Sequence, residues 1–141
     1  MRKKWRFIIS IVLVLFVGLC PYNTTVVPAW KLRIVDEKGQ PYANIPATQA
    51  WKDYSLELTA GQNLDTRSTN TDGYVEFPQR EMSASVLQRI FKTILSALMT
   101  LAHGGFGVQA YVHASGPQGY SEVDYERGKP LPAQLVLPSK N

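Results

Sequence analysis

Cysteine and histidine are scarce in this sequence of 141 residues, which has one cysteine, Cys20, and two histidines, His103 and His113. One cysteine excludes an intrachain disulfide, and it leaves the redox state of the compartment open. The fold therefore depends on an apolar core, and about 110 residues suffice for one without disulfides or metals. The length suits a single domain of about 100–150 residues.

Outside the N-terminus, the sequence has no excess of positive or negative charge. Four of the fifteen basic residues lie there, at Arg2, Lys3, Lys4 and Arg6, which leaves eleven basic and eleven acidic residues elsewhere. A phosphate-binding surface needs basic groups clustered on the fold. Nucleic acid is therefore excluded as an expected partner.

Charged residues are absent between Arg6 and Lys31. The first part of this uncharged stretch is the apolar run Phe7–Cys20. A basic start followed by an apolar run is typical of a secretory signal or signal anchor. We predict a hydrophobic N-terminal helix and contact with the membrane through residues 7–27. By the positive-inside rule, the rest of the chain is expected on the outer, periplasmic side of a bacterial inner membrane.

Four alternatives stay open for residues 1–29. A retained anchor is favoured, because the uncharged Pro21–Ala29 extends the run toward the roughly 20 residues of a membrane span. A cleaved signal with Val27-Pro28-Ala29 before the cut would give a secreted protein. A lipoprotein signal is disfavoured by the large Leu19 before Cys20, and a buried core helix is the last alternative.

Beyond residue 29 the pattern is one of short strands between turns. Trp30, Leu32 and Ile34 alternate with basic residues and are predicted to point inward from a first strand. Pro46 interrupts the next strand, so that strand is placed at an edge or bulge. Many short strands favour a β-sandwich. Further strands are predicted at 43–51, 66–69, 74–77, 106–113, 120–126 and 133–137, with an irregular loop at 53–64 and a turn at 116–119. Alternate side chains are predicted to point inward from these strands, among them Ala43, Phe106 and Ala133, whereas Tyr111 and His113 point outward.

One amphipathic helix, predicted at 83–102, interrupts the strands. Ser83 is its expected N-cap, and polar residues lie opposite an apolar stripe with a spacing of three and four. Three roles stay open for this stripe: packing on an open face of the sandwich, which is favoured, docking of a partner, or contact with a membrane. The stripe consists of Leu87, Phe91, Ile94, Leu98 and Leu101.

Two short motifs resemble a known family. Val35–Pro41, followed by Ala43–Ile45, has a Gly turn and a Pro between two strands, and Thr69–Phe77 has an Asp-Gly turn that leads to an aromatic residue. Together they resemble carboxypeptidase regulatory-like domains, which share the transthyretin-like (prealbumin-like) sandwich. The resemblance implies a seven-strand-type sandwich over residues 30–141, with the helix as an insertion, and an extracytoplasmic accessory module without activity of its own.

Acidic residues are the only candidates for a metal site, and we expect neither metal nor other cofactor. Three carboxylates in line on a strand spread over about 13 Å, too far apart to share one ion. Turn aspartates usually accept hydrogen bonds from their own backbone. The two sets are Glu122, Asp124 and Glu126 on a strand, and Asp36, Asp65 and Asp72 in turns.

Catalysis has little support in the sequence. A histidine-dependent nucleophile needs an oriented partner, and no motif joins His113 to the nearby Ser115. Hydroxyisourate hydrolases share the transthyretin-like sandwich, but Arg33 stands where their first strand carries a catalytic histidine. Residues 125–128 likewise depart from their terminal Tyr-Arg-Gly-Ser motif. We expect no enzyme, and a small hydrolase is the least favoured function.

Aromatic and helical side chains give the candidate surface. Tyrosine and tryptophan exposed on a β domain suit a glycan or peptide, although packing is their commoner role. The helical residues suit an envelope protein partner. We expect a membrane-anchored, non-catalytic accessory or interaction module of the cell envelope, with a ligand-binding module as the alternative. The candidate residues are Trp51, Tyr54, Tyr111, Phe91 and Leu98.

Overall fold

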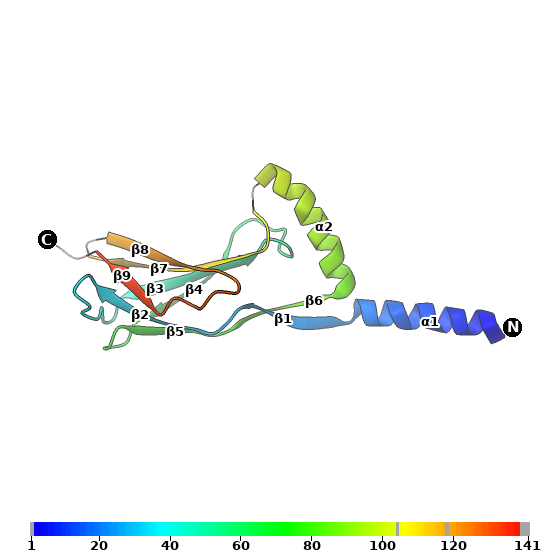
Figure 1. Ribbon diagram of the computed structural model, residues 1–141, viewed down its shortest axis with the longest axis horizontal. Helices are drawn as coiled ribbons and strands as arrows, with labels where there is room; N and C mark the ends of the chain where they lie inside the picture. Colours follow the sequence, from blue (N-terminus) through cyan, green and yellow to red (C-terminus); the bar gives the residue numbers. More distant parts are fainter. Residues whose placement is uncertain (1, 104, 118, 139–141) are drawn as a thin grey trace.

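The computed structural model describes residues 2–103, 105–117 and 119–138, and in this part of the chain the fold is mainly β, with three sheets and two helices (Figure 1). Helix α1 spans Arg2–Leu19 and helix α2 spans Val86–His103. The strands are β1 (Pro21–Val27), β2 (Trp30–Asp36), β3 (Pro46–Asp53), β4 (Asn63–Ser68), β5 (Tyr74–Phe77), β6 (Arg80–Ser85), β7 (Val108–Gly116), β8 (Gly119–Tyr125) and β9 (Gln134–Leu137).

Two of the sheets bury one apolar core between them (Figure 1). One has the strand order β5-β2-β9 and the other β4-β3-β7-β8. All neighbouring strands are antiparallel except β2 and β9, which are parallel. The largest buried side chain is Trp30, only 1% exposed, whose Nε1 donates to the Pro132 carbonyl at 2.7 Å.

The third sheet is a two-stranded ribbon of β1 and β6 that extends beyond the other two sheets (Figure 1). Val26 and Val27 lie in the apolar core, so the base of the ribbon is tied to the β domain. At the other end Pro21 pairs with Ser85. Both helices therefore leave the ribbon at the same end, α1 along the direction of β1 and α2 across it.

The alternating burial predicted from the sequence is confirmed in four strands. The side chains of Trp30, Leu32 and Ile34 are buried on β2, and the same period places hydrophobic residues inward on the others. These are Val75 and Phe77 on β5, Ala110 and Val112 on β7, and Leu135 and Leu137 on β9.

The two short motifs meet in space. In the first, Asp36 Oδ1 accepts from the amides of Lys38 and Gln40 at 2.9 and 2.7 Å. In the second, Gly73 has a φ of +79°, and a Cβ on it would lie 2.7 Å from the Ile34 carbonyl and 3.0 Å from Pro41 Cβ. The tight turn therefore needs glycine both for its backbone angle and for its approach to the first motif.

Several expected boundaries were wrong. The N-terminal helix ends at Leu19, and residues 21–27 form strand β1 within the segment predicted to be a signal. Strand β6 occupies 80–85, so α2 begins at Val86 rather than Ser83. None of the helices in the described part combines the length and apolar character required to cross a membrane.

The second predicted strand was also misplaced. Pro46 opens β3, and β3 lies between β4 and β7 rather than at an edge. As the first residue, Pro46 does not remove a hydrogen bond from the interior of the strand. Ala43, Phe106 and Ala133 lie outside the strands and are exposed, although they were expected to point inward. The turn expected at 116–119 includes Gln118, which lies outside the described residues.

Candidate functional site

Helix α2 begins where β6 ends, because Ser85 caps it. The Ser85 hydroxyl accepts from the Gln88 amide at 3.2 Å, and Gln88 Oε1 accepts from the Ser85 amide at 3.0 Å. This reciprocal pair is a capping box, which satisfies two backbone donors at the helix start. The ribbon therefore passes directly into a helix whose first turn is fixed by hydrogen bonds.

The polar face of α2 is turned toward the protein. The guanidinium of Arg89 donates to the carbonyls of Tyr22, Met82 and Ala84 at 3.1 to 3.3 Å. Its Cζ also lies 4.4 Å from the centre of the Tyr22 ring. The charge of Arg89 is thus used to hold the helix against the β1–β6 ribbon.

The second half of α2 is held in the same way. Ser96 is buried, and its hydroxyl donates to the Tyr54 carbonyl. The Thr100 hydroxyl lies 2.9 Å from the Ser96 carbonyl and 3.1 Å from the Gly105 carbonyl. Polar side chains along the whole helix therefore bind the ribbon at one end and the segments around Tyr54 and Gly105 at the other.

The described residues of the apolar stripe of α2, from Leu87 to Leu98, consequently point outward, and the side chain of Leu101 lies outside the described residues. Phe91 and Leu98, two of the predicted surface residues, are 69% and 63% exposed. Packing of this stripe on an open face of the sandwich, the favoured expectation, is therefore wrong, because the polar face occupies the inner side. The other exposed hydrophobic residues of α2 are Val86, Leu87, Ile90, Ile94 and Met99.

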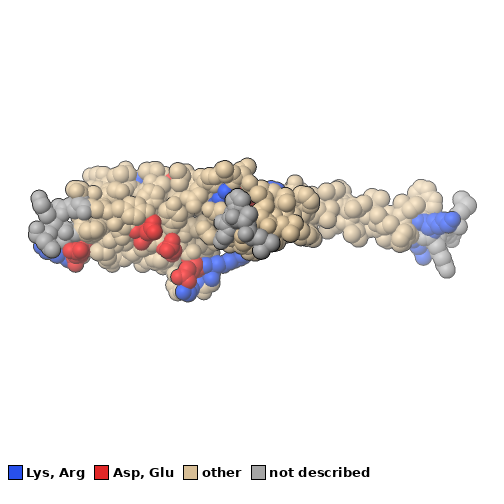
Figure 2. All heavy atoms as spheres, turned by 90° about the horizontal axis from the view of Figure 1, so that it is seen from above, with Lys and Arg blue, Asp and Glu red and all other residues tan. Residues whose placement is uncertain are grey.

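Helix α1 is apolar on every side. All its residues from Phe7 to Val17 are exposed, and only Ser10 among them is polar. Figure 2 shows a stretch of this helix without charged side chains between the basic N-terminal end and the β domain. A Cβ on Gly18 would lie 3.4 Å from Leu87 Cγ, so the end of α1 meets the start of α2. The apolar surfaces of the two helices are continuous there.

The three predicted aromatic residues do not form one surface with the helical pair. Trp51 packs partly against the core, where the guanidinium Cζ of Arg80 lies 4.2 Å from its ring centre. Tyr54 lies under α2 and accepts from Ser96. Tyr111 pairs with Ala50 and Trp51 with Ala110, so Tyr111 and Trp51 point to opposite faces of the four-stranded sheet.

Tyr111 belongs to an aromatic row on the outer face of that sheet. Its ring centre lies 5.8 Å from that of His113, which lies 5.6 Å from that of Tyr120. The Tyr120 hydroxyl donates to Glu122, and this hydrogen bond, with a smaller contribution from burial, raises the pKa of Tyr120 to about 12. Sequence alternation placed Tyr111 and His113 outward but did not bring Tyr120 beside them, because that contact depends on the β7–β8 register.

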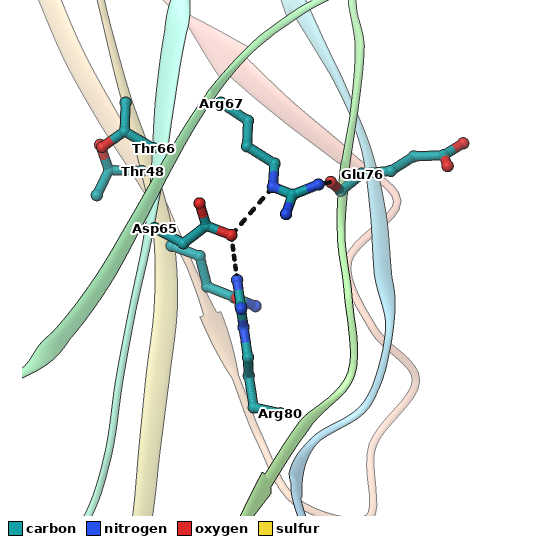
Figure 3. Close-up of polar contacts among 7 residues, drawn as sticks. Thr48, Asp65, Thr66, Arg67, Glu76 and Arg80 are labelled. Carbon is teal, nitrogen blue, oxygen red and sulfur yellow. Dashed lines mark hydrogen bonds and ion pairs between the residues drawn. The ribbon is translucent and has the colours of Figure 1, made fainter.

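Two arginines neutralise Asp65, one of the turn aspartates considered for a metal site. Its carboxylate accepts from Arg80 and, at 3.0 Å, from Arg67 (Figure 3). The hydrogen bond from Arg80, helped by Arg67, lowers the pKa of Asp65 below its ordinary value of 3.8. Arg80 also donates to Gln49 Oε1 at 2.9 Å. Asp65 thus connects β4 to β6 and is already occupied by cations.

The other acidic candidates do not gather. Glu122 and Asp124 lie exposed along β8, whereas Glu126 follows the strand and pairs with Lys129. Over the described ranges, no three histidine, cysteine or acidic side chains lie close enough to hold a metal ion. The side chain of His103 lies outside the described residues.

A cavity of about 210 Å³ opens beneath the C-terminal half of α2. Lys52 and Tyr54 line it, together with Ser96. The Lys52 ammonium donates to the Thr59 carbonyl and lies 4.9 Å from the centre of the Tyr54 ring. The carboxylate of Glu57, which also lines the cavity, accepts from the Asp53 amide and from Asn63 Nδ2. Both charged groups at this cavity therefore already have protein partners, and the exposed helical surface is the more distinctive feature.

Comparison of the chain with protein-family models, with curated proteins and with solved structures gives no match.

Proposed function

We propose that the chain is a non-catalytic interaction module, attached to the cytoplasmic membrane through α1 with its β domain on the outer side. The observation that carries the proposal is the continuous apolar surface of α1 and α2, which serves no packing role in the β domain. Fully burying one large apolar side chain is worth about 1.5–3 kcal/mol. A surface with this many exposed hydrophobic residues is therefore stable only against another apolar medium.

The distribution of charge supports both attachment and sidedness. Four basic residues precede the apolar run of α1, and the rest of the chain carries eleven basic and eleven acidic residues. Basic residues beside an apolar segment stay on the cytoplasmic side. The proposal therefore places Arg2–Arg6 inside and the β domain outside. Helix α1 alone falls short of a membrane span in the described part of the chain, so the proposal relies on the uncharged residues up to Ala29 to extend the apolar run.

The proposed fold family is the transthyretin-like sandwich of carboxypeptidase regulatory-like domains. Support comes from the two motifs that carry the resemblance, which meet where the Asn44 amide donates to the Thr69 carbonyl at 3.1 Å and the Thr69 amide donates to the Ile45 carbonyl at 3.0 Å. A three-stranded and a four-stranded sheet around one core agree with a seven-strand-type sandwich. Since a fold does not determine function, the interaction role is argued from the helical surface.

Membrane attachment is tested by matched substitutions of two leucines with nearly equal exposure, Leu13 of α1 at 60% and Leu64 of β4 at 64%. The test measures retention of the full chain in the membrane fraction after an alkaline carbonate wash. Leu13→Asp should release the protein, because an aspartate in the apolar interior costs about 3 kcal/mol. Leu64→Asp should leave retention unchanged.

Sidedness is tested by adding protease to intact cells whose outer barrier has been opened. The β domain should be digested while a tag before Arg2 is protected. Release of the unaltered protein by carbonate, or protection of the β domain, would contradict the proposal.

A ligand-binding module is the second candidate, favoured by the outer-face row of Tyr111, His113 and Tyr120. A row of exposed aromatic rings beside acceptors such as Glu122 suits a sugar, whose apolar faces stack on such rings and whose hydroxyls donate. Titration of an array of envelope glycans should then show binding that Tyr120→Ala removes. Phe106→Ala, which alters an exposed aromatic residue outside the row, should not change it.

A further inference from the structure

We infer that α2 is an interfacial helix, whose apolar face lies on the same lipid surface that α1 enters. This inference rests on the proposed attachment through α1 and adds a second lipid contact. The β domain would then be held in a fixed orientation by two helices rather than tethered by one.

The geometry of the helices defines the plane of this surface. Helix α2 runs across the direction of α1 and begins beside the end of α1 (Figure 1). Its polar face is bound to Tyr22, Tyr54 and Gly105 on the side of the β domain. The apolar face therefore points away from the sheets, toward the side on which α1 lies. A surface that α1 enters end-on would run along α2.

The side chains of α2 suit the boundary between lipid headgroups and acyl chains. Interfacial helices bury one apolar face by about 5–10 Å and keep the polar face out of the hydrocarbon. Here the apolar face contains Ile90, Phe91 and Ile94, and its exposed residues run from Val86 to Met99. The stripe thus extends over most of the helix, as contact with an extended surface requires.

The usual basic residues of such helices have a different use here. Of the two arginine and lysine residues of α2, Arg89 is bound to three backbone carbonyls and is not free to pair with lipid phosphates, which leaves only Lys92. Membrane contact of α2 should therefore depend on apolar burial and little on anionic lipids.

Continuity with α1 favours lipid over a protein as the occupant. A protein partner would have to cover a helix that is apolar on every side and a second helix that is apolar on one side. Lipid does both without a shaped groove, because a helix that is apolar all round is typical of a membrane or a large core. The contact of Gly18 with Leu87 leaves no polar break between the two surfaces.

The test uses three leucines of nearly equal exposure: Leu13, Leu98 and Leu64 at 60%, 63% and 64%. Each is changed to cysteine in turn in a full-length Cys20→Ser background and labelled with an environment-sensitive fluorophore. The proteins are reconstituted in phosphatidylcholine vesicles, with and without phosphatidylglycerol. Emission wavelength, quenching by spin-labelled lipid and quenching by aqueous iodide are then measured.

The inference expects a blue shift and quenching by spin-labelled lipid at positions 13 and 98, with little change on adding phosphatidylglycerol. Position 64 should remain accessible to iodide. A label at 98 that stays accessible to iodide while the label at 13 is in lipid overturns the inference and leaves attachment through α1 intact. A label at 98 shielded from both quenchers overturns it in favour of a protein partner or a second copy. An iodide-accessible label at 13 refutes the attachment and the inference together.

Discussion

At the scale of single residues, the type of a residue suggested its local role, but the sequence did not predict which side chain it would contact. The sequence shows aspartates in turns and a tyrosine near acidic residues, but Asp65 meets Arg80 only because β6 passes beside β4. Arg80 and Asp65 are fifteen residues apart, and no local pattern links them. The expectation that turn aspartates bind their own backbone describes Asp36, whose carboxylate accepts from two amides of its own turn.

Asp65 should make stability depend on pH in the acid range. Its folded pKa lies below the ordinary 3.8, so its contribution is complete above that value and is lost as pH falls through the lower folded pKa. Asp65→Asn should lower the free energy of unfolding at neutral pH by about 1–3 kcal/mol. The difference from the unaltered protein should shrink in acid, as measured by urea unfolding in detergent solution at several pH values. Asp124→Asn, on the exposed face of β8, is the control, and a difference that stays constant with pH would contradict the prediction.

The hydroxyl of Tyr120 should lose its proton at a higher pH than an ordinary tyrosine. Because Glu122 accepts its phenolic hydrogen and stabilises the neutral form, the pKa of Tyr120 is about 12. Glu122→Gln should lower that pKa toward its ordinary value of 10.0. Assigned ring resonances of Tyr120 followed by NMR between pH 9 and 12.5 check this, with Glu126→Gln as the control. An unchanged midpoint in Glu122→Gln would show that the hydrogen bond does not control the proton.

At the scale of elements, periodicity predicted the type of structure and failed on its orientation. The spacing of Leu87, Phe91 and Leu98 identified a helix because it reports a stripe. The spacing does not indicate whether the stripe faces the core or the outside. The residues that bind the polar face of α2 lie in distant segments of the chain, so the spacing does not identify them either. Strands β1 and β6 were missed for different reasons. β1 merges with the uncharged N-terminal run, while β6 is polar and lies directly before the helix.

Because the apolar face of α2 is exposed, polar substitutions on that face should have little effect on the stability of the β domain. Phe91→Gln with Leu98→Gln should change the free energy of unfolding by no more than about 0.5 kcal/mol, because both side chains are exposed and glutamine keeps a helix. Leu32→Ala should cost about 2–5 kcal/mol, since Leu32 is fully buried. Chemical unfolding of the β domain, followed by the fluorescence of the buried Trp30, measures both. A large loss in the double variant would mean that the stripe is part of a core.

At the scale of the whole molecule, the sequence predicts a β domain with one inserted helix but not its assembly. Alternation identifies the buried faces of β2, β5, β7 and β9, yet it does not say which strands pair. The parallel pairing of Arg33 with Gln134 joins segments about a hundred residues apart, and local rules do not reach that far.

The β1–β6 ribbon argues against cleavage of a signal peptide after Ala29. Cleavage after Ala29 would remove β1, leave β6 unpaired and take Val26 and Val27 from the core. We therefore expect the mature protein to retain residues 21–29. Intact mass and N-terminal peptide analysis of protein purified from membranes measure this. A mature N-terminus at Trp30 would contradict the prediction.

The pairing of Pro21 with Ser85 at the junction of the helices has a mechanical consequence. Hydrogen bonds of an antiparallel ribbon lie across its strands. Tension between α1 and the β domain passes along the backbone of β1 into β2, so it is carried by covalent bonds and does not have to break these hydrogen bonds. A force that spreads α1 from α2 opens the same ribbon one pair at a time, starting at Pro21 and Ser85. The ribbon should therefore resist being pulled away from a membrane far better than it resists separation of its two helices.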